Sequence, residues 1–516
     1  MASAVEVTVS GGTLRGTEVG GVRAFRGVPY AASTAGAGRF AAPVPVEPWS
    51  GVRDATRSGP ACPQPTGGMP GQEQNVFGEL FGPGDLPMDE SCLVVDVYTP
   101  AGGAAGKPVL VWIHGGAFRI GTGSSPMYDG SALARRGDVV VVAVNYRLGV
   151  LGFLNLPDVG PSNVGLRDQI AALEWVRDEI GAFGGDPGNV TIFGESAGGK
   201  SVECLVASPL ARGLFRRAIA QSTYDPPMDA EPAADAARAL LADLGVVDGD
   251  GSIDADRLRS LPVGEILDAQ NRQTMAAMAS GGGIMASLGG WSPVVDGEVL
   301  PRRPIDAIAA GEAADVAMII GTTRDEAKLF TAMMPMLAGM EDAGLPMMIG
   351  MLTGDPDGAE ALVAAYRASR GAGTSALDVF AATMTDRMFR QHSLRLAEAK
   401  AAHQPDTWMY LFDWCGVGMD GAIGACHALE IPFVFGTLDS GLGRLAGAGP
   451  DAEALAATMQ DAWLAFARTG DPSTPALGWS RYETGRRATA AFGPTVEVRD
   501  APLDAERLAW VSVGVA

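Results

Sequence analysis

The feature that most constrains the fold is a serine set between glycines where a strand would turn into a helix. Residues 194–199 have the sequence Gly-Glu-Ser-Ala-Gly-Gly, between the apolar run 190–193 and residues 201–207, which favour a helix. With 70 glycines in the chain, this pattern alone could mark an ordinary surface turn, so its strand-to-helix context carries the prediction. A serine exposed at such a turn is a candidate nucleophile, which makes Ser196 the first candidate catalytic residue.

Apolar runs alternate with amphipathic helical stretches along much of the chain. This alternation predicts an α/β fold, with a large, mostly parallel central sheet flanked by helices. In such sheets, functional groups gather at the carboxyl ends of the strands. Four apolar runs end at a polar motif: 109–113 before His-Gly-Gly, 139–144 before Asn-Tyr-Arg, 218–220 before Gln-Ser, and 318–320 before Gly-Thr-Thr-Arg-Asp-Glu.

Residues 226–290 and 328–400 depart from this alternation, because they are helix-prone and rich in alanine. We predict that they are helical insertions over the active site and that residues 1–516 form a single domain. The methionines in these segments have two interpretations: they pack in the core between helices, or they line a substrate pocket whose apolar wall adapts to different groups. These methionines are Met275, Met278, Met285, Met333, Met334, Met336, Met340, Met347, Met348 and Met351.

The charge of the chain argues against several classes of partner. The 60 acidic residues outnumber the 38 basic ones, so we expect neither nucleic acid nor an anionic membrane as a partner. The first residues have no basic and apolar signal segment, and no apolar stretch of about eighteen residues follows, which predicts a cytoplasmic protein. The five cysteines have no Cys-x-x-Cys spacing, so we expect no metal site.

A serine nucleophile needs a base, and the chain has only four histidines. His114 precedes two glycines and fits an anion-binding turn better. His392 and His403 flank a charged, helix-like stretch. His427 lies in a loop after the strand-like run 408–412, which makes it the predicted base.

The imidazole needs a carboxylate that fixes its tautomer and balances its charge. Glu326, just past a strand end, is the predicted acid. The order Ser196, Glu326, His427 is the chain order of α/β hydrolases. Asp325 is the competing acid, although neighbouring side chains in a loop seldom point the same way.

The tetrahedral intermediate of acyl transfer carries an oxyanion that backbone N–H groups must meet. Gly115 and Gly116 follow one strand-like run, and Ala197 follows the candidate nucleophile. We predict that these three residues donate the N–H groups of an oxyanion hole.

Further motifs occur in order along nearly the whole chain. They include Phe-Arg-Gly-Val-Pro-Tyr-Ala at 25–31, Val-Trp-Ile-His-Gly-Gly-Ala-Phe at 111–118, Asn-Val-Gly-Leu-Arg-Asp-Gln at 163–169, Gly-Glu-Ser-Ala-Gly-Gly at 194–199, Asp-Glu at 325–326, His-Ala-Leu-Glu-Ile-Pro-Phe at 427–433 and Phe-Ala-Arg-Thr-Gly-Asp-Pro at 466–472. Together these motifs resemble the type B carboxylesterase and cholinesterase family, in particular its bacterial para-nitrobenzyl esterases. The resemblance implies an α/β-hydrolase fold, a Ser196, Glu326 and His427 triad, and the oxyanion hole named above.

The family further implies a hydrogen bond from Ser222 near the acid and the histidine, and a structural ion pair between Arg147 and Asp168. Members of the family often have a disulfide bond between the cysteines that correspond to Cys62 and Cys92. In a reducing cytoplasm this pair could equally remain as two thiols.

Two lysines depart from the family pattern close to catalytic positions. Lys200 follows the serine motif and Lys328 follows the acid. We expect both lysines to lie at the surface. The alternative for Lys200 is that its charge influences the binding of a substrate with an anionic acyl group.

The resemblance implies hydrolysis of carboxylic esters, broadly apolar short-chain or aryl esters, through an acyl-enzyme and without a cofactor. The expected partner is a small-molecule ester, and the expected state is a monomer or homodimer. A carbamate or amide hydrolase on the same triad is one alternative. A noncatalytic cholinesterase-like binding protein is another, which the presence of Ser196, Glu326 and His427 disfavours.

Overall fold

The structure is a computed structural model that describes residues 3–65, 76–226, 228–277, 290–337 and 339–514. Two units can be told apart within it. The first comprises Met1–Ala218 and Pro226–Val316, and the second comprises Ile219–Asp225 and Ala317–Ala516.

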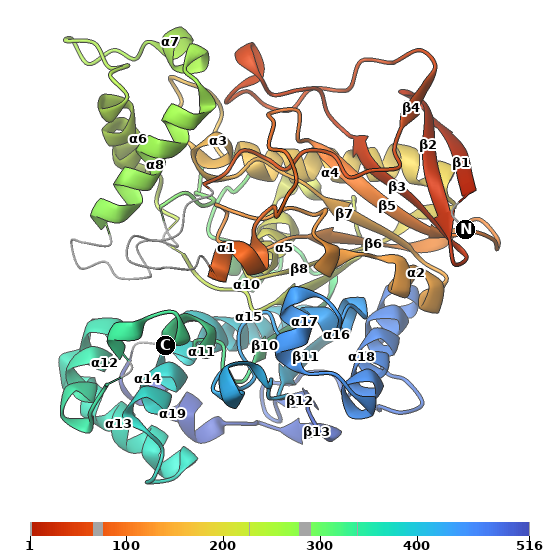
Figure 1. Ribbon diagram of the computed structural model, residues 1–516. Helices are drawn as coiled ribbons and strands as arrows, with labels where there is room; N and C mark the ends of the chain where they lie inside the picture. The colour runs from red at the N-terminus through yellow and green to blue at the C-terminus, as the bar shows by residue number, and fades with distance from the viewer. Residues whose placement is uncertain (1–2, 66–75, 227, 278–289, 338, 515–516) are drawn as a thin grey trace. The chain divides into compact units, whose positions relative to one another are not determined.

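The first unit is built on a mixed β-sheet. Its strands are β1 (Ser3–Val9), β2 (Gly12–Val19), β3 (Val22–Pro29), β4 (Val52–Asp54), β5 (Val94–Pro100), β6 (Lys107–Ile113), β7 (Val140–Val144) and β8 (Gly185–Glu195). They run in the order β1-β2-β3-β5-β7-β6-β8, with β4 beside β2 (Figure 1). β6 is parallel to both β7 and β8, whereas β1, β2, β3, β5 and β7 pair antiparallel in turn. The valine-rich β7 is buried throughout, as expected of a strand covered on both faces.

The helices of the first unit include those predicted between residues 226 and 290. Ile170, Leu173 and Val176 form a buried stripe on α4 that packs into the core. The described helices are α1 (Val76–Phe81), α2 (Ser131–Gly137), α3 (Gly149–Phe153), α4 (Val164–Glu179), α5 (Ala197–Ala207), α6 (Ala230–Asp243), α7 (Ala255–Ser260), α8 (Val263–Ala277) and α10 (Pro304–Ala309). In Figure 1, α6, α7 and α8 form one group.

The second unit continues the α/β pattern. Its strands are β9 (Arg217–Gln221), which begins two residues before the unit, β10 (Ala317–Thr323), β11 (Thr407–Phe412), β12 (Ala488–Phe492) and β13 (Val496–Asp500). They follow one another in numerical order, with β10, β11 and β12 parallel and β13 antiparallel at the end. The predicted α/β class is confirmed, and the antiparallel pairs make its sheet structure mixed.

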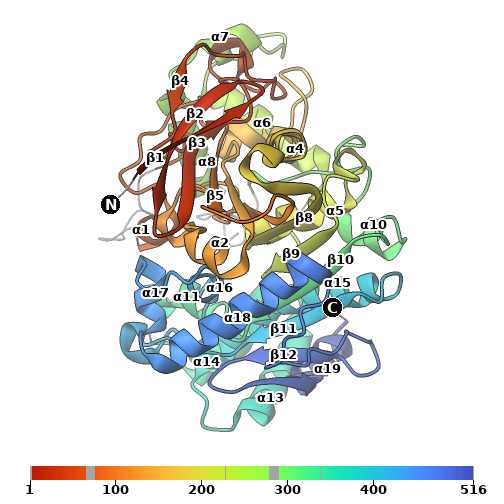
Figure 2. The ribbon, with the colours of Figure 1, turned by 90° about the vertical axis from the view of Figure 1, so that its right-hand side faces the viewer.

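Helices cover the sheet strands of the second unit, and residues 328–400 are largely helical, as predicted. α18 (Pro450–Thr469) lies beside the sheet strands of this unit (Figure 2). Its Trp463 packs against Tyr410 of β11, with 5.4 Å between ring centroids. The helices are α11 (Lys328–Ala332), α12 (Leu345–Thr353), α13 (Pro356–Arg370), α14 (Ala376–Thr385), the π-helix η8 (Asp386–Arg390), α15 (Gln391–Ala401), α16 (Ile431–Phe435), α17 (Gly441–Ala446), α18 (Pro450–Thr469) and α19 (Asp504–Ser512).

Several methionines of the second unit are exposed instead of forming helix core. Met336, Met347 and Met351 are 85%, 65% and 69% exposed. Met278 and Met285 lie outside the described residues. A role of these methionines in a substrate pocket stays a prediction.

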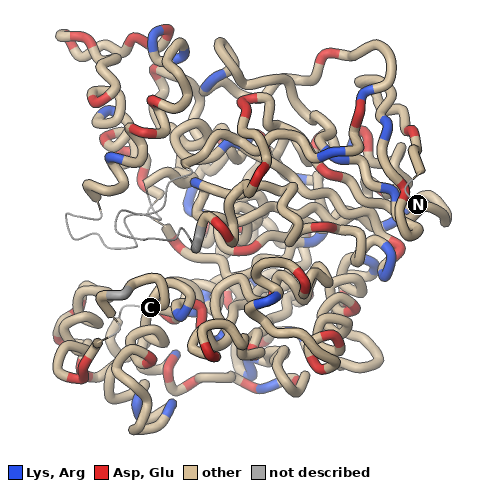
Figure 3. The backbone as a smooth tube through the Cα atoms, in the orientation of Figure 1, with Lys and Arg blue, Asp and Glu red and all other residues tan. Residues whose placement is uncertain are grey.

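Acidic residues recur along the backbone of both units (Figure 3), in keeping with the net charge of −22. Among the described helices, none combines the length and the apolar character that crossing a membrane requires.

Candidate active site

The serine turn forms in the first unit as the sequence predicts. Ser196 follows β8 and is the N-cap residue of α5. Its φ of 57° and ψ of −120° form a backbone conformation that residues other than glycine rarely adopt. A Cβ atom at Gly198 would lie 2.0 Å from the carbonyl oxygen of Ile113 in β6, so only glycine fits there. The glycine therefore lets the first turn of α5 pack against the strand that leads to His114.

The candidate oxyanion-hole residues of the first unit lie around this turn. A Cβ atom built at Gly115 would be 3.2 Å from Cβ of Ser196, which places Gly115 beside the candidate nucleophile. Gly116 follows it, and Ala197 is the first residue of α5. The first N–H groups of a helix have no partner within the helix and lie at its positive end, so this region suits a developing negative charge.

His114 has a structural place beside these residues. Its ring stacks on Tyr146 with 4.5 Å between centroids, and the Tyr146 hydroxyl donates to the His114 carbonyl at 2.8 Å. Burial lowers the pKa of His114 to about 4, so the ring is neutral near pH 7.

The expectation that Lys200 lies at the surface is wrong. All eleven residues of α5 are buried, so no face of this helix reaches solvent. Lys200 is 0% exposed, and its Nζ lies 2.9 Å from Glu203 Oε1, one turn further along. A charge in this position requires such a partner, because an isolated buried ion is strongly disfavoured.

Lys328 is only partly at the surface, so its expected exposure is wrong in part. It begins α11 in the second unit, its side chain is 23% exposed, and its Nζ lies 2.9 Å from Asp378. Neither lysine is therefore a free surface charge.

The predicted acid and base meet in the second unit. Glu326 Oε2 lies 2.6 Å from Nδ1 of His427, and both side chains are buried. The other carboxylate oxygen, Oε1, accepts hydrogen bonds from the Ser222 hydroxyl at 2.6 Å and from the Thr323 N–H at 2.8 Å. The carboxylate is thus held at both oxygens, and a proton on Nδ1 of His427 leaves Nε2 as the basic nitrogen.

Two aromatic rings that sequence reasoning missed pack against this imidazole. The ring centroid of His427 lies 5.2 Å from that of Phe330 in α11 and 4.7 Å from that of Phe389 in η8. Single phenylalanines in helix-prone segments carry no motif, so no local signal marks them. Together with the Glu326 contact, the rings restrict how the imidazole can turn.

Asp325, the competing acid, faces other partners in the second unit. Its carboxylate binds the guanidinium groups of Arg324 at 2.8 Å and Arg370 at 3.4 Å. It is Glu326, and not Asp325, whose carboxylate contacts the His427 ring.

The remaining histidines lie elsewhere in the second unit. His392 is buried within α15, and His403 follows the end of that helix.

Two contacts implied by the family resemblance are present in the first unit. Arg147 forms a buried, bidentate pair with Asp168, with N···O distances of 2.8 and 2.7 Å. Cys62 and Cys92 form a disulfide bond. The ion pair and the disulfide both stabilise the fold, and we assign neither of them a role in catalysis.

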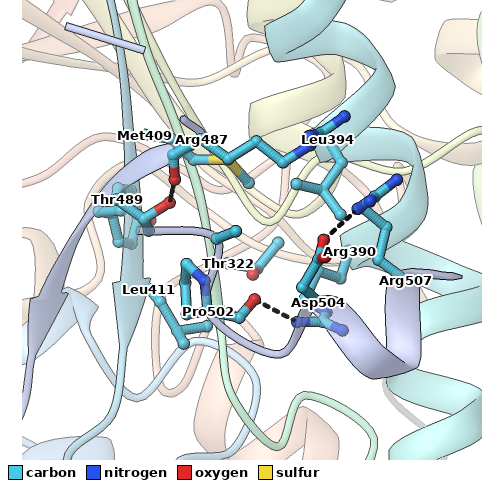
Figure 4. Close-up of a pocket in the computed structure, with 12 residues that line it drawn as sticks. Thr322, Arg390, Leu394, Met409, Leu411, Arg487, Thr489, Pro502, Asp504 and Arg507 are labelled. Carbon is cyan, nitrogen blue, oxygen red and sulfur yellow. Dashed lines mark hydrogen bonds and ion pairs between the residues drawn. The ribbon is translucent and has the colours of Figure 1, made fainter. Parts of the chain in front are cut away.

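A cavity in the second unit is lined by Arg390, Arg487 and Arg507, and each of these arginines is paired with a carboxylate (Figure 4). Arg507 binds Asp504 at 2.6 Å, and Arg390 forms a buried pair with Asp386. In the described part of the chain, no group of three or more histidine, cysteine or acidic side chains is placed to hold a metal ion. Neither feature supplies a second candidate active site.

Comparisons with known proteins agree over nearly the whole chain. The sequence model described as "Carboxylesterase family" matches residues 3–509. The para-nitrobenzyl esterase of Bacillus subtilis (strain 168) is 40% identical over 97% of each chain, and the phenmedipham hydrolase of Pseudarthrobacter oxydans is 36% identical over 93% of this chain and 94% of its own.

Solved structures give the same result. A "PNB esterase" superimposes with a TM-score of 0.83 at 38% identity, covering 98% of this chain and 100% of its own. A "thermophylic PNB esterase" gives a TM-score of 0.85 at 38% identity with the same coverage.

Proposed function

Because this chain belongs to the carboxylesterase family and is a carboxylic ester hydrolase, we propose that it cleaves apolar short-chain or aryl esters through an acyl-enzyme on Ser196. The observation that carries the proposal is the Glu326 carboxylate, which binds Nδ1 of His427 at 2.6 Å while Ser222 holds its other oxygen. That arrangement leaves Nε2 of His427 as a base, as the proposed mechanism requires.

In the first half of the proposed reaction, Nε2 of His427 accepts the Ser196 proton while Oγ attacks the ester carbonyl. The imidazolium that forms is stabilised by Glu326, which remains ionised. It then gives its proton to the departing alcohol, and the acyl group stays on Ser196.

In the second half, water takes the place of the alcohol. His427 removes a proton from the water as it attacks the acyl carbonyl, and Ser196 leaves with the proton returned to it. In both halves, the N–H groups of Gly115, Gly116 and Ala197 are the proposed donors to the oxyanion, and losing one such donor costs about 10²- to 10³-fold in kcat. The mechanism needs no metal or organic cofactor.

The family match spans both units, which supports a single catalytic domain over residues 1–516, with residues 226–290 and 328–400 as helical insertions over the active site. We further propose a cytoplasmic enzyme that acts as a monomer or homodimer on small esters.

The test is turnover of a short-chain aryl ester by Ser196→Ala. We expect a loss of at least about 10⁴-fold in kcat with an unchanged circular dichroism spectrum. Ser201→Ala is the matched control, because Ser201 lies on the same helix and accepts a hydrogen bond from Gln169 at 3.0 Å. Wild-type turnover by Ser196→Ala would overturn the proposal.

A further inference from the structure

Two loops of the second unit carry the proposed acid and base, and backbone hydrogen bonds join them. We call residues 323–327 the acid loop and residues 424–428 the histidine loop. The Asp325 N–H donates to the Ala425 carbonyl at 2.9 Å, and the His427 N–H donates to the Glu326 carbonyl at 3.2 Å. The two loops are thus paired directly beside Glu326 and His427.

The side chain of Asp325 adds a third link between these loops. Its Oδ2 accepts a hydrogen bond from the Ala425 N–H at 3.2 Å, so Asp325 both donates to and accepts from one residue of the histidine loop. Asp325 is only 4% exposed, so little water competes for this contact.

The histidine loop is shaped to admit this carboxylate. Gly424 has φ 52°, and a Cβ atom built there would lie 2.6 Å from Oδ2 of Asp325. A side chain at position 424 would therefore push the carboxylate away from Ala425.

Arginines balance the charge of Asp325 and tie it to more distant parts of the second unit. Arg324 binds Oδ2, and Arg370 at the end of α13 approaches Oδ1 at 3.4 Å. Arg370 in turn binds Glu506 of α19 at 2.8 Å. Although burial works against its charged form, Arg324 keeps the pKa of Asp325 below its ordinary value, so the carboxylate is ionised near pH 7.

We propose that Asp325 is a positioning residue that fixes the acid loop against the histidine loop and thereby sets the geometry of the Glu326 and His427 pair. The proposal rests on the ester-hydrolase mechanism above and goes beyond it, because Asp325 touches neither the substrate nor the reacting atoms. It acts through Glu326, the next residue in the chain. A misplacement of about 1 Å in a catalytic group can cost about 10²-fold in rate, so a loop contact of this kind can control kcat.

The test combines Asp325→Ala with Glu326→Gln in a double-mutant cycle on an aryl ester. We expect Asp325→Ala alone to lower kcat by about 10²-fold while KM changes less than about twofold. In the Glu326→Gln background, where the carboxylate that it positions is already lost, Asp325→Ala should cost less than about threefold. An equal loss in both backgrounds, or a lower melting temperature with unchanged kcat, would overturn the proposal.

Asp325→Asn keeps the test decisive if Asp325→Ala does not fold. It preserves the shape and one oxygen for Ala425 while removing the charge that the arginines bind. We expect a kcat about tenfold lower in the wild-type background and nearly unchanged in Glu326→Gln. Equal losses in the two backgrounds would again contradict a positioning role.

Asp413→Asn is the matched control. Asp413 pairs with Arg324 and lies 2.9 Å from Arg499, so the variant removes a largely buried carboxylate from the same guanidinium without touching the histidine loop. We expect its kcat to stay within about threefold of wild type. Failure of this proposal is distinguishable from failure of the proposed function: in the first case Ser196→Ala is inactive and Asp325→Ala is normal, and in the second Ser196→Ala retains turnover.

Discussion

In the first unit, backbone geometry holds the candidate nucleophile, whereas in the second unit side-chain hydrogen bonds hold the candidate acid and base. Ser196 owes its place to a positive φ angle and to the close packing of Gly198 against β6. Glu326 is held by Thr323 of its own loop and by Ser222 and His427, which lie 104 and 101 positions away in the chain. The difference teaches that the candidate nucleophile is held by residues close to it in sequence, whereas the candidate acid and base are held largely by residues far apart in sequence.

The largest effect should come from changing a side chain of the second unit without changing its shape. Glu326→Gln keeps the volume but removes the charge that stabilises the imidazolium and fixes its tautomer. We expect kcat to fall by about 10⁴-fold while the melting temperature changes little. A kcat within tenfold of wild type would show that catalysis does not depend on the contact between Glu326 and His427.

In the first unit, removing a buried charge should lower the free energy of unfolding. Lys200→Met removes the ammonium that Glu203 contacts in a fully buried place, which we expect to cost about 3 kcal/mol in the free energy of unfolding. The double variant Lys200→Met with Glu203→Leu should recover much of that loss, as measured by urea unfolding. No recovery would show that the two residues do not act as a pair.

The next prediction concerns how stability depends on pH, through a buried histidine of the first unit. The folded pKa of His114 is about 4, and its unfolded pKa is about 6.5, so the unfolded chain binds more protons between these values. Stability should therefore fall as pH drops from about 6.5 towards 4, with a contribution from His114 of up to about 3 kcal/mol. His114→Gln should show a shallower decline in urea unfolding across this window, and an unchanged slope would contradict the burial argument.

The smallest effect should come from the outer contact of the acid. Ser222→Ala removes one of three hydrogen bonds to the Glu326 carboxylate and leaves the His427 contact in place. We expect kcat to fall by about tenfold with KM unchanged, because the acid is less firmly oriented. A loss as large as that of Glu326→Gln would place Ser222 on a level with the acid itself.

The contrast between the units also explains what the sequence could predict. Ser196 lies in a motif whose glycines are needed for local packing, so its turn could be placed from a few residues. Glu326 and His427 could be placed because each follows an apolar run at a strand end and their chain order fits one fold class.

Other features depend on contacts that no local pattern records. The burial of Lys200 follows from α5 being covered on every side, although Glu203 three residues later was an available signal. Phe330 and Phe389 reach His427 from different helices, and Arg370 reaches Asp325 from 45 positions away.

The most direct test of the central claim is mass spectrometry of the enzyme after reaction with an aryl phosphonate ester. The account predicts one phosphonyl group per chain, on the peptide that contains Ser196, with loss of ester turnover in proportion to labelling. Labelling of another residue, or full turnover after complete modification of Ser196, would contradict it.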